Sequence, residues 1–307
     1  MKQFKIIFFL LFITHQLFAQ TDIDAIMMEK NAFCVGPMYS YSSWKNYWEG
    51  TFKRDNQNLG TVTTQMFSVM GNYGVSQKLN LLFNVPYVTT KASAGQLRGM
   101  RGLQDLSLMV KYRPINKKIG YARLAVYGIG GISTPLTNYV ADYLPLAIGL
   151  KSKTAMVRLM VDYYYNNKWF VTASGTYVFR DNITLDRNSY YTTELVLSNK
   201  VFMPNVATFN IRAGWRTQYL IAEAVFNNIT TQGGFDITKN DMPFPSNRMN
   251  ASSIGANFKY VFKKKDHLSL TGGAHQVIAG RNMGQSLNLN FGVFYVIDVG
   301  KKEKKDK

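Results

Sequence analysis

The sequence of 307 residues contains one cysteine, Cys34, so no disulfide can form within the chain. Histidine is also rare, at three residues. With so few of these side chains, no cluster has the spacing of metal ligands. We therefore expect no metal site, no cofactor and no enzymatic activity.

Charged residues and long apolar runs are scarce as well. Asp, Glu, Lys and Arg make up 18% of the chain, against roughly 25% in soluble domains. No run reaches the roughly 20 apolar residues that a membrane-spanning helix needs. Yet 46% of residues are hydrophobic and 14% aromatic, which excludes disorder. Mean hydropathy is −0.14, so apolar and polar residues must be interleaved. This combination indicates a β protein whose outer surface faces something other than water.

Acidic residues are half as frequent as basic ones, 18 against 36, which gives a net charge of +18. Such a charge is typical of proteins that bind nucleic acid or anionic membranes. The N-terminus, however, predicts export: a basic head ends at Lys5, apolar residues run from Ile6 to Phe18, and Ala19 stands at the expected cleavage position. We predict a signal peptide over residues 1–19, since the apolar stretch is too short for a membrane helix. Export leaves about +16 and separates the protein from nucleic acid.

The rest of the chain divides into three parts. Residues 20–34 form a short polar leader, and residues 35–298 have a uniform texture without linker or repeat. Residues 299–307 form a basic tail, which we expect to be solvated; contact with an acidic partner is the alternative.

Within residues 35–298, apolar and polar side chains alternate over segments of roughly 10 to 13 residues, the period of a β-strand. The clearest examples are Leu79–Thr90, Leu103–Arg113, Trp169–Arg180 and Leu287–Ile297. A soluble β-sandwich would show the same alternation. Three features favour a membrane barrel instead: segment length, aromatic residues at segment ends, such as Tyr163–Tyr165, and connectors that alternate between short and long.

The connectors set the predicted topology. Short turns are expected on the periplasmic side and long loops outside. The short ones are Ser76–Lys78, Pro114–Lys118, Asn166–Asn167, Met203–Asn205 and Lys263–Asp266; the long ones are Ser43–Gly60, Lys91–Gly102, Pro135–Leu150, Asp181–Ser189 and Gln232–Asn250. A break at Arg216–Gln218 would give thirteen strands, and bacterial barrels use even numbers. Because alternation continues through this point, we predict one long strand over Val206–Thr231. The predicted fold is an all-β, antiparallel up-and-down barrel of about 12 strands, with 14 as the alternative.

The polar faces of these strands carry mostly basic side chains, which we expect to line the lumen. The candidates are Lys111, Arg113, Arg123, Arg158, Arg180, Arg212, Arg216 and Lys259, with Asp162 and Glu194 opposing them. An excess of positive charge would favour anions. Alternatively, Arg–carboxylate pairs fill and brace a narrow interior.

Two motifs evoke other chemistry. His267 and Ser269 lie two apart on one predicted strand face, as in twelve-stranded outer-membrane phospholipases, where a His can activate a Ser hydroxyl. Leu270-Thr271 follows, however, where that family continues Asn-Gly. Gly128–Gly131 superficially resembles a phosphate loop, but no helix is expected to follow it, so packing of small residues is the better interpretation.

Several short stretches resemble a family of outer-membrane barrels named after the meta-pathway of phenol degradation, which are distant relatives of hydrophobic-compound uptake channels. The matching residues are Tyr73, Gly74, Pro86, Tyr87, Gly102, Asp105, Lys111, Tyr112 and Arg113. Gly131–Pro135 is similar to that family's approach to an external loop. Gln104 and Leu136-Thr137 depart from the family pattern, and the chain continues past its last strand. The resemblance implies a twelve-stranded barrel for passage of small aromatic or hydrophobic compounds and transfers no catalytic residue.

The leading hypothesis is a barrel in the outer membrane of a Gram-negative bacterium. It would pass a small solute, aromatic or anionic, through a basic polar lumen that an external loop such as Pro135–Leu150 or Gln232–Asn250 constricts. Its expected partners are outer-membrane lipid and the solute, and not nucleic acid. The alternatives are a structural or binding barrel with a plugged lumen, and an outer-membrane hydrolase. The sequence does not identify the solute or the oligomeric state.

Overall fold

The computed structural model describes residues 21–238, 241–263 and 265–300, and within them it contains strands and turns but no helix. Accordingly, no helix of the described chain is long and apolar enough to cross a membrane. The predicted signal peptide and residues 301–307 of the predicted tail lie outside the described residues.

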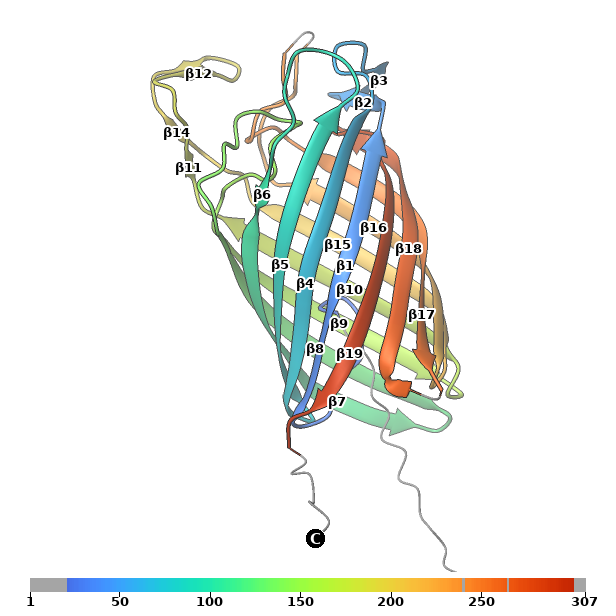
Figure 1. The fold of residues 1–307 in the computed structure, drawn as a ribbon. Helices are drawn as coiled ribbons and strands as arrows, with labels where there is room; N and C mark the ends of the chain where they lie inside the picture. The colour runs from blue at the N-terminus through green and yellow to red at the C-terminus, as the bar shows by residue number, and fades with distance from the viewer. Residues whose placement is uncertain (1–20, 239–240, 264, 301–307) are drawn as a thin grey trace, which may run out of the picture.

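Twelve long strands form a closed barrel, which confirms the predicted fold (Figure 1). Each strand pairs antiparallel with the next one along the chain, and the last closes on the first, with Ala32 opposite Asp298. The barrel strands are β1 (Ala32–Trp44), β4 (Val62–Ser76), β5 (Leu79–Ala92), β7 (Asp105–Ile119), β8 (Ala122–Pro135), β9 (Thr154–Tyr165), β10 (Trp169–Arg180), β15 (Val206–Arg216), β16 (Leu220–Thr231), β17 (Asn250–Phe262), β18 (Lys265–Arg281) and β19 (Leu287–Asp298).

The remaining strands are short and belong to the long connections at one end of the barrel. One of them, β6, adds to the edge of β5 where β5 extends beyond β7. The others pair as β2 with β3, β11 with β14, and β12 with β13. Their bounds are β2 (Asn46–Glu49), β3 (Phe52–Asp55), β6 (Arg101–Leu103), β11 (Ile183–Thr184), β12 (Tyr190–Tyr191), β13 (Leu195–Val196) and β14 (Lys200–Val201).

Short turns and long loops are segregated to opposite ends of the barrel, as expected. The start of β1 and the end of β19 both lie at the short-turn end (Figure 1). The turn between β9 and β10 shows how the sequence makes these reversals. Asn166 and Asn167 have φ angles of 48° and 51°, and asparagine tolerates this left-handed region better than most residues. We refer to the short-turn end as periplasmic and to the long-loop end as external.

Several parts of the predicted topology are wrong. Pro114–Lys118 is not a turn: β7 continues to Ile119, with a bulge between Tyr112 and Ile115, and the chain reverses at Gly120-Tyr121. A bulge leaves a residue outside the ladder, so Pro114 costs no hydrogen bond there. The long strand predicted over Val206–Thr231 is in fact the hairpin of β15 and β16.

The prediction of twelve strands holds because a second error offsets the hairpin. Met203–Asn205 was expected to be a periplasmic turn, but these residues lie at the external end, directly before β15. Residues 181–205 form an external arm that contains β11 to β14. An apolar cluster holds the base of this arm together; it consists of Ala141, Ile183, Leu185, Tyr190, Val201 and Met203.

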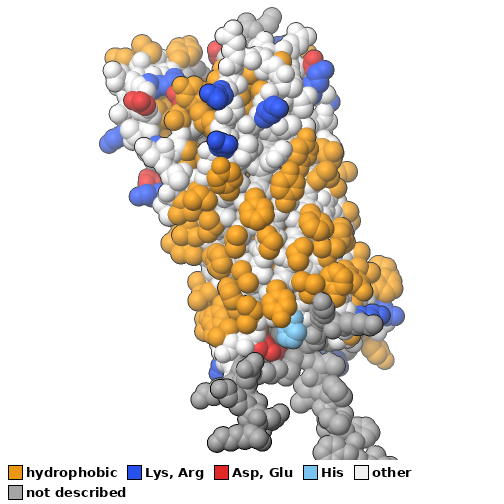
Figure 2. Space-filling view, in the orientation of Figure 1, with side chains coloured by type: hydrophobic (Ala, Val, Ile, Leu, Met, Phe, Trp, Pro, Cys, Tyr) orange, Lys and Arg blue, Asp and Glu red, His pale blue; other side chains and the backbone are white. Residues whose placement is uncertain are grey.

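The barrel's outer face is apolar over most of its height, and the Lys and Arg side chains in view lie mainly near the external end (Figure 2). The predicted alternation is confirmed: Leu81, Val110 and Leu289 are each more than 40% exposed, although all three are apolar. Aromatic side chains gather at the periplasmic turns, where Trp169 and Trp215 face each other across β10 and β15, 5.2 Å between ring centroids. Large apolar side chains turned outward, with aromatic residues at their border, are typical of a lipid-facing surface.

The external mouth is partly filled by loop 136–153. Leu146 is fully buried and packs with Leu59 and Val62, while Ile148 packs on Val88. The hydroxyl of Thr90 on β5 donates to the carbonyl oxygen of Leu146 at 2.6 Å. Part of this loop therefore lies against the inner faces of β4 and β5.

Candidate functional site

The leader does not trail away from the barrel but occupies its lumen. Residues 21–28, hereafter the N-terminal segment, lie between β7–β9 on one side and β1 and β19 on the other. Ala25 packs with Tyr127 and Met160, while Met28 packs with Cys34 and Phe294. The phenol of Tyr127 donates to the carbonyl oxygen of Ala25 at 2.7 Å.

Lys111 anchors the segment. Its side chain is 0% exposed, and Nζ donates to the carbonyl oxygens of Thr21, Asp24 and Ile26 at 3.1, 2.5 and 2.9 Å. A fourth contact, of 3.2 Å, reaches Oδ1 of Asp24. The other carboxylate oxygen of Asp24 accepts from the backbone amide of Thr21 at 2.7 Å. Among the described residues, the hydrogen bonds of this buried ammonium group all go to the segment, which makes the segment part of the folded barrel.

Arg158 on β9 holds the start of the segment. Its Nη1 donates to the carbonyl oxygen of Asp22 at 3.0 Å and to the carboxylate of Asp22 at 2.9 Å. Its Nε donates to Oγ1 of Thr176 at 2.7 Å, which fixes the guanidinium.

Further cations line the wall formed by β15, β16 and β17. Arg212 pairs with Glu223 at 2.8 Å, and Oε1 of Glu223 also accepts from Asn257 at 2.9 Å. Asn257 in turn bonds the ring of His275 at 2.8 Å. Lys259, on the same wall, attracts Asp24 electrostatically. This wall therefore presents a connected set of polar groups to the lumen.

A brace near the periplasmic end is separate from that network. Arg216 makes two hydrogen bonds to the buried carboxylate of Asp162, at 3.1 and 3.2 Å, and its guanidinium lies 4.0 Å from the ring centroid of Phe170. Thr172 donates to Asp162 at 2.6 Å. Such a buried ion pair, with two hydrogen bonds from Arg216 and one from Thr172, holds three strands together.

The lumen is also rich in methionine, on both sides of the N-terminal segment. Met38 and Met70 flank the cluster at Cys34, while Met109, Met156 and Met160 belong to the cluster around Tyr127. Methionine is flexible and polarisable, and surfaces rich in it adapt to varied apolar partners.

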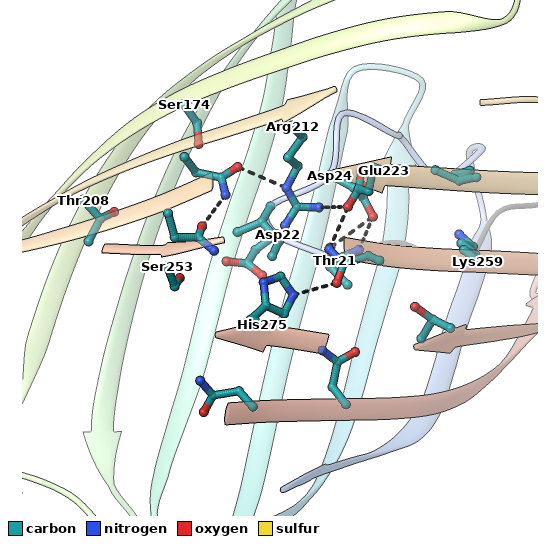
Figure 3. Close-up of a pocket in the computed structure, with 18 of the residues that line it drawn as sticks. Thr21, Asp22, Asp24, Ser174, Thr208, Arg212, Glu223, Ser253, Lys259 and His275 are labelled. Atoms are coloured by element: carbon teal, nitrogen blue, oxygen red, sulfur yellow. Dashed lines mark hydrogen bonds and ion pairs between the residues drawn. The ribbon is translucent and has the colours of Figure 1, made fainter. Parts of the chain in front are cut away.

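A cavity of about 540 Å³ remains beside the N-terminal segment (Figure 3). Its lining is mixed: Met38, Met70 and Phe294 are apolar, whereas Arg158, Arg212, Lys259 and His275 are polar or cationic. The segment contributes Thr21, Asp22, Ile23, Asp24 and Ile26, and Figure 3 shows several of these around the same space as Arg212, Glu223 and His275. The cavity is large enough for a single aromatic ring with a polar group.

The structure brings four of the ten sequence-predicted lumen residues together around the N-terminal segment, and two more, Asp162 and Arg216, form the brace. Lys111, Arg158, Arg212 and Lys259 surround the segment and its cavity. Arg113 donates to the carbonyl oxygen of Gln77 at a periplasmic turn. The other predicted basic residues lie near the strand ends, with Arg123 5.0 Å from the ring centroid of Tyr164, and Arg180 at the external end of β10.

Glu194 was predicted to line the lumen, and this is wrong. It is an exposed residue between β12 and β13 of the external arm. The error follows from counting part of the arm as a barrel strand, because alternation in a short hairpin looks like alternation in a spanning one.

Several of the family-motif residues have visible structural roles. Gly74 lies so close to Glu29 that an added methyl group would overlap that residue's carbonyl oxygen, and its own carbonyl accepts from the amide of Asn31 at 2.7 Å. Tyr73 donates to Asn31 at 3.4 Å. These contacts lead the chain from the N-terminal segment into β1.

The second group of motif residues organises the external end. Oδ1 of Asp105 accepts from the phenol of Tyr139 at 2.7 Å, and Gly102 lies against Ile148. The carbonyl oxygen of Pro86, next to Tyr87 on β5, accepts from Gln104 at 3.0 Å. Loop 136–153 is thus held by motif residues, while Tyr112, 47% exposed, faces outward.

The His267 and Ser269 pair does not form a nucleophile with its base. Within the described chain the hydroxyl of Ser269 makes no hydrogen bond and is buried. The ring of His267 instead lies 6.1 Å from the outward-facing ring of Tyr295. Gly128–Gly131 lies within β8, so it is not a phosphate loop. Among the described residues, no three His, Cys, Asp or Glu side chains lie close enough to hold a metal ion.

Asp22, Asp24, Glu223, Asn257 and His275 were missed by the sequence reasoning. The leader offered one signal, two aspartates among small and apolar residues after the predicted cleavage point. Only the closed barrel shows that this piece of chain turns inward.

A closed twelve-stranded barrel with an apolar outer belt and a polar, charged interior defines the class: this is a β-barrel of the Gram-negative outer membrane. Residues 59–292 match the family described as "Putative MetA-pathway of phenol degradation", and the chain belongs to that family. The resemblance noted from the sequence motifs is confirmed. Comparison with curated proteins found no match.

The solved structures that resemble this barrel are related only distantly in sequence. An outer-membrane channel from Pseudomonas putida F1 superposes with a TM-score of 0.72 at 14% identity, covering 91% of this chain and 99% of that one. The translocator domain of the autotransporter NalP from Neisseria meningitidis gives 0.48 at 9% identity, covering 89% and 90%. The monoaromatic hydrocarbon channel CymD gives 0.39 at 10% identity, covering 88% of each chain.

Proposed function

We propose that the barrel passes a small amphipathic solute, an aromatic or other apolar body with an anionic group, across the outer membrane. The observation that carries this proposal is the mixed lining of the lumen, in which methionines lie beside basic side chains: Met109 and Lys111 share the inner face of β7, and Met156 and Met160 flank Arg158 on β9. The methionines would adapt to the apolar body of the solute, and the basic side chains would attract its anionic group. The phenol-degradation name of the family is consistent with an aromatic solute, and the fold shared with an outer-membrane channel is consistent with passage.

In this proposal the lumen is closed by a removable part. The N-terminal segment lies in the path, and its contacts to Lys111, Arg158 and Tyr127 are hydrogen bonds and packing rather than strand pairing. Passage would require the segment to shift, while the paired strands stay in place. Loop 136–153 would narrow the external mouth, as its burial against β4 and β5 suggests.

Reconstitution of the folded protein in vesicles tests the proposal. Entry of benzenesulfonate, an aromatic anion, should exceed entry of the uncharged sugar ribose, and deletion of residues 21–26 should raise the entry of both. A barrel that conducts no ions in a planar bilayer and admits neither solute, with or without the segment, would refute passage.

A second candidate is a structural barrel with a filled interior, favoured by the closed pairs of Arg216 with Asp162 and of Arg212 with Glu223. In that case Arg212→Gln would lower stability and leave permeability unchanged. In a passage barrel the same change should also alter the entry of benzenesulfonate, so one variant separates the two candidates.

A further inference from the structure

The N-terminal segment carries two carboxylates, and each is placed on a cation of the barrel wall. Asp22 bonds Arg158 at 2.9 Å and Asp24 contacts Lys111 at 3.2 Å. The rest of the segment is largely apolar: Ile23 and Ile26 line the cavity, and Ala25 and Met28 pack on the wall. The segment thus combines anionic groups with apolar side chains, the same chemistry as an amphipathic acid.

Lys111 and Arg158 both need a negatively charged partner because they are buried. Lys111 is 0% exposed and the side chain of Arg158 is 11% exposed. The other carboxylates at this level are engaged elsewhere, Glu223 with Arg212 and Asp162 with Arg216. Removing one partner of a buried ion pair leaves an uncompensated charge and is strongly unfavourable. The segment will therefore leave most easily when another anion takes over Lys111 and Arg158.

The adjoining cavity is placed to receive such an anion. It borders Asp22, Asp24 and Arg158 directly. Lys259 adds positive potential at Asp24, and Met38, Met70 and Phe294 supply an apolar surface close by. A bound acid would find contacts similar to those that the segment makes, without a new cavity having to form.

We propose that Asp22 and Asp24 are tethered stand-ins for the acidic group of the solute, and that an organic anion opens the lumen by displacing them from Arg158 and Lys111. This inference rests on the proposed function and deepens it: the segment is a built-in competitor, so a neutral compound of the same shape does not release it. Solute and segment would bind to one set of cations in turn.

Cys34 provides a natural reporter of displacement. It is the only cysteine of the chain, it is 1% exposed, and it packs with Met28 of the segment. Its rate of modification by N-ethylmaleimide should therefore rise when the segment moves. The full-length folded protein is titrated with benzoate, or with benzamide as the uncharged isostere, at constant ionic strength.

We expect benzoate to accelerate modification of Cys34 by roughly tenfold or more, since hydrogen bonds to charged groups of this kind change populations on that scale. Benzamide should leave the rate within about twofold, below the effect of one such bond. In Asp22→Asn combined with Asp24→Asn, which keeps the shape and one acceptor oxygen of each side chain, modification should be fast without benzoate. If that double variant does not fold, Asp22→Asn alone carries the test, because Asp22 makes fewer contacts than Asp24.

Equal effects of benzoate and benzamide, or no effect of either, would overturn the competition. So would a double variant that folds yet protects Cys34 as well as the native chain does. Conductance of the same preparations keeps the two proposals apart. If the channels conduct but benzoate does not change their conductance, only the competition is wrong. If no variant conducts, the passage function is wrong as well.

Discussion

At the scale of single residues, Lys111 is the most informative side chain, because its amine contacts four oxygens of the N-terminal segment. Lys111→Met keeps most of the length of the side chain and removes every one of these contacts. We expect the hold on the segment to weaken by about 3 kcal/mol, roughly a hundredfold in population. Planar-bilayer recordings should show a larger open fraction than in the native protein.

Lys117→Met is the matched control, since Lys117 lies on the same strand but is exposed near the periplasmic rim. It should conduct like the native barrel. If Lys111→Met folds and its open fraction is unchanged, the segment is not held by this lysine.

Asp236 allows a prediction of pH dependence outside the membrane. The hydrogen bonds from Arg281 outweigh the opposing effect of burial and, with a further hydrogen bond from Asn282, hold the pKa of Asp236 at about 2. The folded pKa lies below the unfolded value of about 3.9, so the pairing stabilises the loop above that pH, and the stabilisation is lost as pH falls towards 2. Hydrogen exchange around Asp236, corrected for its intrinsic pH dependence, should increase between pH 5 and pH 2.5.

The variant Asp236→Asn should remove most of that increase, because its amide does not titrate. Hydrogen bonds of Asn282 should hold the loop in this variant at every pH. Its Oδ1 accepts from the backbone amides of Gly50 at 2.8 Å and Ile237 at 3.0 Å, and none of these groups titrates. An increase of equal size in the variant would assign it to other groups.

Sequence reasoning succeeded with lumen residues on long strands and failed with the groups that face them. Lys111, Arg158 and Arg212 could be assigned to the inside because each interrupts an apolar alternation at the right phase. Their partners Asp22 and Asp24 have no such phase, since they lie in irregular chain before the first strand. Pairing across the lumen depends on closure of the barrel, a long-range event that no local pattern records.

At the scale of elements, the hairpin of β15 and β16 shows why alternation can mislead. In the single long strand predicted over Val206–Thr231, Ile221 would share the outer face with Trp215, but it is 7% exposed and lines the cavity. Its neighbours Leu220 and Ala222 face outward instead. The lumen is apolar in places, so an apolar residue does not identify the lipid side. The turn between the strands closes through Thr217, whose amide donates to the carbonyl oxygen of Leu220 at 2.8 Å.

Gly74 joins two elements, β4 and the chain that leads into β1. Gly74→Ala would place a methyl group on the carbonyl oxygen of Glu29, and backbone gives way less easily than a side chain. We expect a cost of about 1–3 kcal/mol, seen as a lower unfolding temperature and as faster modification of Cys34.

Gly128→Ala is the control for this substitution. Gly128 lies within β8, and a methyl group there would meet nothing within 4 Å. Its unfolding temperature and Cys34 reactivity should match those of the native protein. If Gly74→Ala also behaves like the native barrel, the leader adjusts at that point and the glycine is not required.

At the scale of the whole molecule, the closed lumen is nearly balanced in charge. The cations around the segment and the adjoining brace are Lys111, Arg158, Arg212, Arg216 and Lys259. Four carboxylates accompany them, Asp162 and Glu223 on the wall and Asp22 and Asp24 on the segment. In the closed lumen the basic side chains are therefore largely neutralised by carboxylates. Half of these carboxylates belong to the N-terminal segment and would leave with it.

This distribution predicts the ion selectivity of the open state. Deletion of residues 21–26 removes both segment aspartates and leaves the five cations facing two carboxylates, so anions should be favoured. The reversal potential across a potassium chloride gradient should move toward that of chloride. Unshifted mobility in gel electrophoresis without heating would first establish that the deleted barrel is folded.

Full-length protein carrying Asp22→Asn and Asp24→Asn separates charge from blockage. It has the same lumen charge as the deletion but retains the segment, so its open events should be equally anion-selective while its mean conductance stays lower. If the deleted barrel conducts more and yet prefers cations, the interior cations are not what a permeating ion meets, and the path runs along another part of the wall. If both variants prefer anions to the same degree, selectivity is set by the wall of β7, β9 and β15–β17, and the segment acts on access alone.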